Sequence, residues 1–233
     1  RMLLEQGRLL LEAAEHLVGE TRALARGWET DITIAVDALV PLQALYPLVE
    51  RLAELTDTRL RLRAEVLAGS WECLEDGRAD LLISSLNPDI TLTGIKHQPL
   101  QEEVMLYVAH PDHPLHGEPE PLADETLRRY RAIAIADTAR RKPALTYRLL
   151  DKQPRLTVST MGEKRDALLA GIGVGTMPLS WIEEDIKAGR LKVIGPEYRH
   201  QVQVVLAWRR DTMGKAKSWL VREIPKLFPC KGE

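Results

Sequence analysis

Three histidines have a spacing that could serve a metal ion. His110, His113 and His116 form an HxxHxxH pattern, and imidazole is a common ligand of zinc. Pro111 and Pro114 interrupt any helix that would aim three rings at one point, because proline breaks helix geometry. We therefore expect a solvated turn here, and neither a metal site nor a cofactor.

A glycine cluster in residues 168–178 raises the question of a phosphate-binding loop. In nucleotide sites such glycines lie between a strand and the helix that follows it. Here a predicted helix comes before the glycines and a predicted strand comes after them. We expect Gly171 to end the helix in a left-handed conformation, Gly173 to allow a tight turn, and Gly175 to permit close backbone packing.

Neighbouring carboxylates are the remaining candidates for catalysis. The pairs are Glu102–Glu103 and the run 183–185, which is expected early in a helix, where acids offset the helix dipole. We expect both groups on solvated faces. The sequence has no nucleophile elbow, HExxH motif or Walker loop, so it does not predict an enzyme.

A helix start near Thr160 is better suited to binding. Thr160 and Glu163 form a capping-box pattern, and free backbone N–H groups at a helix start suit a small anion or a ligand carbonyl. We expect Thr160 to cap the helix, which leaves Ser159 freer to contact a ligand.

Alternating strands and helices must position these residues. The first half predicts strands at 31–36, 59–66 and 80–84, separated by helices, which indicates parallel pairing and a ligand site at the carboxyl edge of the sheet. A less regular stretch then leads to a strand at 103–109, and the proline-rich turn at 110–121 marks a boundary. The second half predicts strands at 132–136, 156–158, 174–177 and 201–208 and helices at 162–170, 179–187 and 215–228.

The first 26 residues carry a seven-residue leucine repeat at Leu3, Leu10, Leu17 and Leu24. Such a stripe is typical of a helix that pairs with another chain. Packing of this helix on its own domain is the alternative. The chain opens on Arg1 inside the helical pattern, which is expected of a piece of a longer protein.

Composition narrows the class further. The 233 residues are 45% hydrophobic and carry a formal charge of −2, which is ordinary for a folded protein and gives no surface for neutralising DNA phosphates. No apolar run is long enough for a membrane span. Two cysteines without a CxxC motif, and no leader pattern, favour the cytoplasm.

Several segments together resemble one family. These are the leucine-striped helix, residues 32–41, the segment from Leu74 to Ile83, the His-Pro-Asp-His-Pro-Leu turn and residues 167–178. In this order and spacing they resemble the linker and effector-binding region of a LysR-type transcriptional regulator. The resemblance covers essentially the whole chain.

This resemblance implies a fold and partners. The fold is α/β and type 2 periplasmic-binding-protein-like, with two Rossmann-like subdomains joined by two crossover strands after a long linker helix. We expect the linker at 1–27, subdomain I at 30–108 plus 202–228, and subdomain II at 109–201. The resemblance further implies a small-molecule effector between the lobes, a homodimer or homotetramer, DNA binding through a winged helix-turn-helix before Arg1, RNA polymerase as a further partner, and no membrane.

The family's effector-contacting positions can be carried onto this sequence. They fall on Asp37, Ala38, Leu39, Gly69, Ser70, Trp71, Asp137, Thr138, Ser159, Thr160 and Met161. An inward Asp37 disfavours an anionic effector unless its carboxylate is engaged elsewhere, while Leu39, Trp71 and Met161 favour an apolar or aromatic one. We expect a neutral, partly aromatic effector. The alternative for Trp71 is that it fills the core.

Two other classes of protein remain as alternatives. A transport-type solute-binding protein would share the two-lobed fold but would be a monomer. A small α/β enzyme would turn over a metabolite.

Overall fold

The computed structural model describes residues 27–86, 94–210 and 213–228. Their nine strands form one mixed sheet in the order β2-β1-β3-β9-β4-β7-β5-β6, with β8 paired to β4. The leucine repeat at Leu3, Leu10, Leu17 and Leu24 lies outside the described residues. Within the described part, no helix has the length and apolar character needed to cross a membrane.

The strands and helices have the following bounds. The strands are β1 (Asp31–Asp37), β2 (Arg59–Glu65), β3 (Leu81–Ser85), β4 (Ile95–Ala109), β5 (Ala132–Ile135), β6 (Arg155–Val158), β7 (Val174–Pro178), β8 (Lys192–Val193) and β9 (His200–Arg209). The α-helices are α2 (Tyr46–Ala53), α3 (Ala68–Glu75), α4 (Asp124–Leu127), α5 (Met161–Leu169), α6 (Leu179–Lys187) and α7 (Lys215–Glu223). Short 3-10 turns cover Leu42–Leu45, Pro114–Gly117, Pro196–Tyr198 and Ile224–Leu227.

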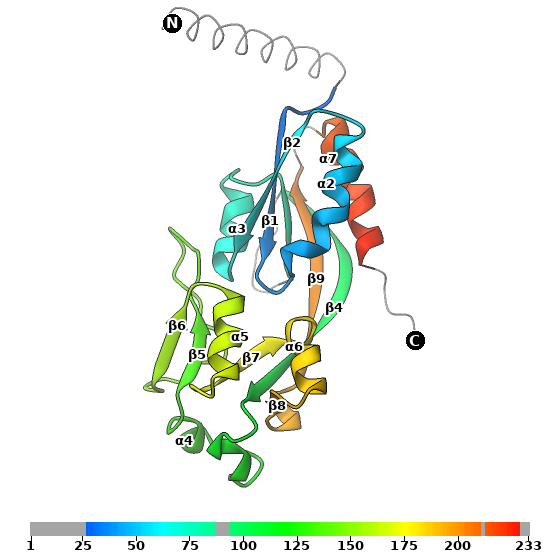
Figure 1. Cartoon of the computed structure of the whole chain (residues 1–233). Helices are drawn as coiled ribbons and strands as arrows, with labels where there is room; N and C mark the ends of the chain where they lie inside the picture. The colour runs from blue at the N-terminus through cyan, green and yellow to red at the C-terminus, as the bar shows by residue number, and fades with distance from the viewer. Residues whose placement is uncertain (1–26, 87–93, 211–212, 229–233) are drawn as a thin grey trace, which may run out of the picture.

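Lobe I is the part of the molecule that contains β1, β2, β3, α2, α3 and α7 (Figure 1). Strand β1 pairs in parallel with both β2 and β3, as the alternation of strands and helices predicts. Ile32 and Ile34 point to the face covered by α2 and α7, whereas Ala35 points to the face covered by α3. Because successive residues of a strand face opposite sides, the central strand β1 of this sheet is covered on both faces.

Lobe II is the part that contains α4, α5, α6, β5, β6, β7 and β8 (Figure 1). Strand β5 pairs in parallel with β6 and β7. Leu168 of α5 and Ile182 of α6 pack with Met177 on one face of this sheet. Val174 packs with Leu127 on the other face.

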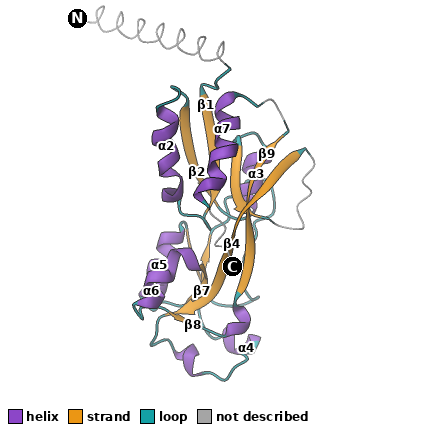
Figure 2. Cartoon of the chain, turned by 90° about the vertical axis from the view of Figure 1, so that its right-hand side faces the viewer, coloured by secondary structure: helices purple, strands orange, loops and turns teal. Residues whose placement is uncertain are grey.

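Strands β4 and β9 run through both lobes (Figure 2). They are antiparallel from the Ile95–Arg209 pair to the Met105–His200 pair. The expected strand at 103–109 is therefore too short, because residues 95–102 already belong to the strand, with a register shift between Pro99 and Gln101. The first half of β4 exposes Lys96 to solvent and pairs with β9, which lies about a hundred residues later in the chain. No local hydrophobic pattern therefore marks this part of the strand.

The helix expected at 215–228 is also corrected. Helix α7 ends at Glu223 and continues as a 3-10 turn. Pro225 lies in that turn and has no backbone N–H to extend an α-helical ladder.

The glycine cluster follows α5 and leads into β7, so the structural order differs from that of a phosphate loop. Gly171 has φ of +70° and ends the helix, as expected. A Cβ at Gly173 would lie 2.3 Å from the carbonyl oxygen of Arg131, so Gly173 serves a close backbone approach rather than a turn. A Cβ at Gly175 would lie 3.0 Å from the carbonyl oxygen of Ile133, which confirms close packing there.

The expected capping box is present at the start of α5. The N–H of Glu163 donates to Oγ1 of Thr160 at 3.1 Å, and Oε2 of Glu163 accepts the N–H of Thr160 at 3.0 Å. The same Oε2 accepts the N–H of Ser159 at 2.8 Å. The carboxylate of Glu163 thus satisfies two backbone donors next to the helix start.

A Thr160→Ala substitution tests this cap. We expect it to lower the free energy of unfolding by about 1 kcal/mol, because the N–H of Glu163 loses its acceptor. Urea unfolding measures the difference. Ser159→Ala is the matched control, since within the described residues its hydroxyl makes no hydrogen bond, and we expect a change below about 0.5 kcal/mol. Equal losses in the two variants would contradict the assignment.

The neighbouring carboxylates are not both on solvated faces, so that expectation is wrong. The side chain of Asp185 is fully buried near the end of α6, where the helix dipole disfavours an acid. Two arginines, Arg165 and Arg190, hold it there by hydrogen bonds. Glu103 is also buried and accepts the backbone N–H of Ser180 at 3.3 Å.

Candidate functional site

Asp37 ends β1 at the carboxyl edge of the lobe I sheet. Its carboxylate is 5% exposed and accepts hydrogen bonds from the N–H of Leu39 at 3.0 Å, Oγ of Ser70 at 2.6 Å and Oγ of Ser84 at 3.3 Å. Burial raises the pKa of Asp37 above its usual value, against the effect of these donors. The carboxylate is thus engaged inside lobe I, which is the condition under which it does not repel an anionic effector.

Trp71 lies in the core of lobe I. It is 2% exposed and packs with Ala35, Leu74 and Leu82, while its indole N–H donates to the carbonyl oxygen of Ser85 at 3.1 Å. Trp71 therefore fills the core of lobe I, which was the alternative to an effector contact.

The start of α3 receives a carboxylate from lobe II. Asp137, which follows β5, accepts the N–H of Ala68 at 3.3 Å and that of Gly69 at 3.0 Å. Beside it, Oγ1 of Thr138 accepts the N–H of Val66 at 2.9 Å. Gly69, Asp137 and Thr138 are three of the predicted effector positions, and they lie together in the structure.

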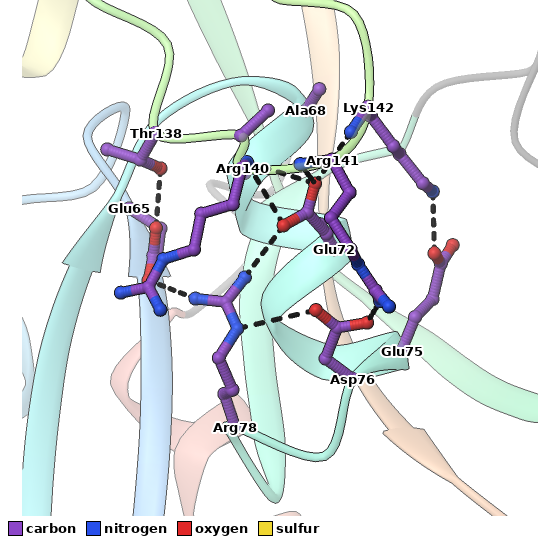
Figure 3. A network of polar contacts seen from close by, with 12 residues as sticks. Glu65, Ala68, Glu72, Glu75, Asp76, Arg78, Thr138, Arg140, Arg141 and Lys142 are labelled. Atoms are coloured by element: carbon purple, nitrogen blue, oxygen red, sulfur yellow. Dashed lines mark hydrogen bonds and ion pairs between the residues drawn. The ribbon is translucent and has the colours of Figure 1, made fainter.

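A second carboxylate crosses between the lobes in the opposite direction (Figure 3). Glu72 of α3 is 1% exposed. Its two oxygens accept the backbone N–H groups of three consecutive lobe II residues, Arg140, Arg141 and Lys142, at 3.0–3.1 Å. Arg78 also donates to Glu72, at 3.2 Å.

Electrostatics favour the charged form of Glu72. The backbone N–H groups of Lys142 and Arg141 lower the pKa of its carboxyl to about 2, against the opposing effect of burial. Two ion pairs flank the contact, one between Lys142 and Glu75 at 2.6 Å and one between Arg141 and Asp76 (Figure 3). The carboxylate is therefore ionised throughout the neutral pH range.

Neither Glu72 nor residues 140–142 were selected from the sequence. The one feature of the sequence that could have pointed to Glu72 is that it is the only charged residue in the run Ser70–Leu74. The backbone donors of 140–142 carry no side-chain signal at all.

The start of α5 supplies the remaining predicted positions. Met161 is buried in the core cluster of lobe II, and Ala38 from the loop after β1 packs against the same cluster. Leu39, in contrast, packs against the core of lobe I. Thr160 is engaged as a cap, and Ser159 is exposed.

A cavity of about 600 Å³ lies elsewhere, where the N-terminal end of the described chain meets α7. It is lined by Gly27, Trp28, Leu55, Met213, Gly214, Lys215, Ser218, Trp219 and Arg222. None of these residues is a predicted effector position.

Two of the three histidine side chains of the turn make local contacts. Nδ1 of His113 accepts the N–H of Leu115 at 3.2 Å, and Nδ1 of His110 accepts the N–H of Asp112 at 3.3 Å. Among the residues that the structure covers, no group of three or more His, Cys, Asp or Glu side chains could hold a metal ion.

Comparison with known proteins places this arrangement in a family. The model of the LysR substrate binding domain matches residues 25–228. The chain is 56% identical to the probable HTH-type transcriptional regulator YhaJ of Escherichia coli K12, across 99% of this chain and 78% of that protein. It is 32% identical to the uncharacterized HTH-type transcriptional regulator YeeY of the same strain, across 96% of this chain and 73% of YeeY.

Solved structures show the same fold at low sequence identity. Full-length LysG from Corynebacterium glutamicum with bound effector Arg matches with a TM-score of 0.68 and 19% identity, across 96% of this chain and 78% of that one. ArgP from Mycobacterium tuberculosis matches with a TM-score of 0.62 and 20% identity, across 94% and 74%. These neighbours support the two-lobed, type 2 periplasmic-binding-protein-like fold.

The named relatives are transcriptional regulators, which favours a regulator over a transport-type solute-binding protein or an enzyme. The fold and the match of the family model to most of the chain agree with them. This chain belongs to the LysR-type family of transcriptional regulators and carries that family's effector-binding regulatory domain.

Proposed function

We propose that this regulatory domain binds a neutral, partly aromatic small molecule between its two lobes and thereby controls transcription. Regulators of this family bind small-molecule effectors and form oligomers. The charge and shape of the effector are the part that we infer from the residues of this chain.

One observation carries the inference about charge. Three sets of backbone N–H groups near the lobe boundary could receive an anionic ligand, since such groups are suited to bind anions. All three face carboxylates of the protein itself: the α3 start faces Asp137, residues 140–142 face Glu72, and the N–H groups of Ser159 and Thr160, just before α5, face Glu163. A ligand carboxylate or phosphate would have to displace one of them.

Apolar side chains support the inference that the effector is partly aromatic. Ala38 and Met161 belong to the same packed cluster although they come from different lobes. Leu39, which follows Ala38 in the sequence, is only partly buried. Apolar walls with a few polar groups are typical of sites for neutral ligands. Within the described ranges the hydroxyl of Ser159 makes no hydrogen bond, and it is suited to donate to, or accept from, a polar substituent of that ligand.

The signal must pass from the ligand to DNA. We propose that an effector with different affinities for two lobe arrangements shifts their populations, and that the leucine-striped helix of residues 1–26 couples subunits of a homodimer or homotetramer. A winged helix-turn-helix would contact DNA, with RNA polymerase as a further partner. DNA-directed action of this kind takes place in the cytoplasm.

Thermal-shift screening with charge-matched pairs tests the effector class. Each pair contains an aromatic amide or ester and the corresponding carboxylate. We expect the stabilising compounds to be the neutral members, with a rise in Tm of about 2 °C or more at a concentration well above Kd. Stronger stabilisation by the carboxylate members would contradict the proposal.

Two serine variants locate the site. Ser159→Ala is expected to weaken a confirmed neutral ligand by about tenfold, the effect of losing one hydrogen bond of about 1.4 kcal/mol. Ser218→Ala is the control, since Ser218 lines the separate 600 Å³ cavity. If only Ser218→Ala weakens binding, the effector occupies that cavity and the assignment between the lobes is wrong.

A further inference from the structure

We propose that Glu72 and the 137–142 segment form an interlobe clasp that holds the two lobes closed when no effector is bound. The clasp consists of Glu72, Asp137 and the backbone N–H groups that each carboxylate receives from the other lobe. The protein's own Glu72 thus fills an anion-binding site on lobe II. This inference concerns the resting state, so it goes beyond the proposed effector class.

The geometry at Glu72 is that of a bound anion. Three consecutive backbone N–H groups, from Arg140 to Lys142, point at one carboxylate with donor–acceptor distances of 3.0–3.1 Å. Successive N–H groups that converge in this way form a concave anion-binding site. Hydrogen bonds to a charged acceptor are roughly twice as strong as neutral ones.

The exchange of carboxylates is reciprocal. Lobe I gives Glu72 to the backbone of lobe II, and lobe II gives Asp137 to the backbone of lobe I at Ala68 and Gly69. Asp137 also accepts the N–H of Ala139 at 2.9 Å within its own loop, which fixes the loop that carries the N–H groups for Glu72. Separation of the lobes would therefore break both contacts together.

Burial makes the clasp insensitive to salt. The Glu72 side chain is 1% exposed, so mobile ions screen its contacts much less than those of surface charges. The flanking pair of Lys142 and Glu75 is 40% and 32% exposed and contributes little. The clasp therefore depends on the backbone contacts of Glu72 and Asp137 more than on the surface ion pairs.

Backbone hydrogen exchange of the full chain without effector tests the clasp. Glu72→Ala removes the carboxylate, Glu72→Gln keeps its size but not its charge, and Glu75→Ala removes only the flanking ion pair. We expect amides 140–142 to exchange at least about tenfold faster in both Glu72 variants, because their hydrogen bonds to a charged acceptor are lost. In Glu75→Ala we expect them to exchange less than about twofold faster, because those hydrogen bonds remain.

The amides of Ala68 and Gly69 give the decisive readout, because they bind Asp137 and make no contact with Glu72. Faster exchange there in Glu72→Gln shows that the lobes separate. Unchanged exchange at 68–69, or equal acceleration in Glu75→Ala, overturns the clasp. Since no effector is present, this experiment decides only on the clasp, and the charge of the effector is decided separately by the thermal-shift screen with charge-matched pairs.

Discussion

A Gly69→Ala variant is expected to hold the two lobes apart. An alanine Cβ would lie 2.1 Å from Oγ1 of Thr138 and 2.6 Å from the backbone nitrogen of Ala139. Overpacking of this kind costs on the order of 2–3 kcal/mol, and backbone atoms of lobe II cannot rotate away as a flexible side chain can. Alanine is also about 1 kcal/mol better than glycine inside a helix, so α3 itself is not weakened.

The measurement is hydrogen exchange at residues 138–142 in the protein without effector. We expect acceleration of at least about tenfold in Gly69→Ala, because a shift of 2–3 kcal/mol changes the closed population by more than that factor. Gly162→Ala is the matched control, since Gly162 is also helical and its added Cβ would meet only Oγ1 of Thr160, at 3.9 Å. Wild-type protection in Gly69→Ala would show that the lobes are not in contact at α3 in solution.

An Asp185→Ala variant is expected to lower the free energy of unfolding by about 2–4 kcal/mol at pH 7. Arg165 donates to the Asp185 carboxylate through Nε at 2.5 Å and Nη2 at 2.8 Å, and Arg190 donates to it at 2.9 and 2.6 Å. Their side chains are 32% and 53% exposed, so water can replace part of the loss. Urea unfolding measures the difference.

Asp166→Ala is the control for the same arginine. Asp166 is 76% exposed and lies 4.0 Å from Arg165, so its removal is expected to cost less than about 0.5 kcal/mol. A loss in Asp166→Ala as large as that in Asp185→Ala would show that the buried position has no special role.

The pH dependence of the Asp185 effect has a definite sign. Burial opposes ionisation, but the hydrogen bonds of Arg165 and Arg190 outweigh it and lower the pKa of Asp185 below its ordinary value of 3.8. A carboxyl whose pKa is lower in the folded than in the unfolded state stabilises the fold at pH values above its unfolded-state pKa. That contribution is lost as the pH falls through the folded-state pKa. The difference between wild type and Asp185→Ala should thus be constant from pH 8 to about 5 and shrink below 3.8.

Local patterns were sufficient wherever a segment is stabilised by its own residues. The alternation in residues 31–84 predicted the parallel strands β1, β2 and β3, and Thr160 with Glu163 predicted the cap of α5. Gly171 predicted the helix end. The cap and the helix end depend on contacts within a few residues, and β1 and β3 are largely buried strands with apolar sequences.

The longest strand was underestimated for the opposite reason. The first half of β4 is stabilised by β9, and its solvated face leaves no apolar alternation. The acids at 103 and 185 were assigned to solvent because their partners, Ser180 and the two arginines, reach them only in the folded chain.

The sequence by itself determined the family, the fold class and most of the elements of this protein. It also predicted Gly69, Asp137 and Thr138 as effector positions, and these three residues lie where the lobes meet. Only the tertiary structure decided what those residues do. Asp37 is enclosed in lobe I, Trp71 fills its core, and Glu72 meets the backbone of residues 140–142. The physical reason is that backbone N–H groups are the same at every residue except proline, so a site built from them depends on how the chain folds.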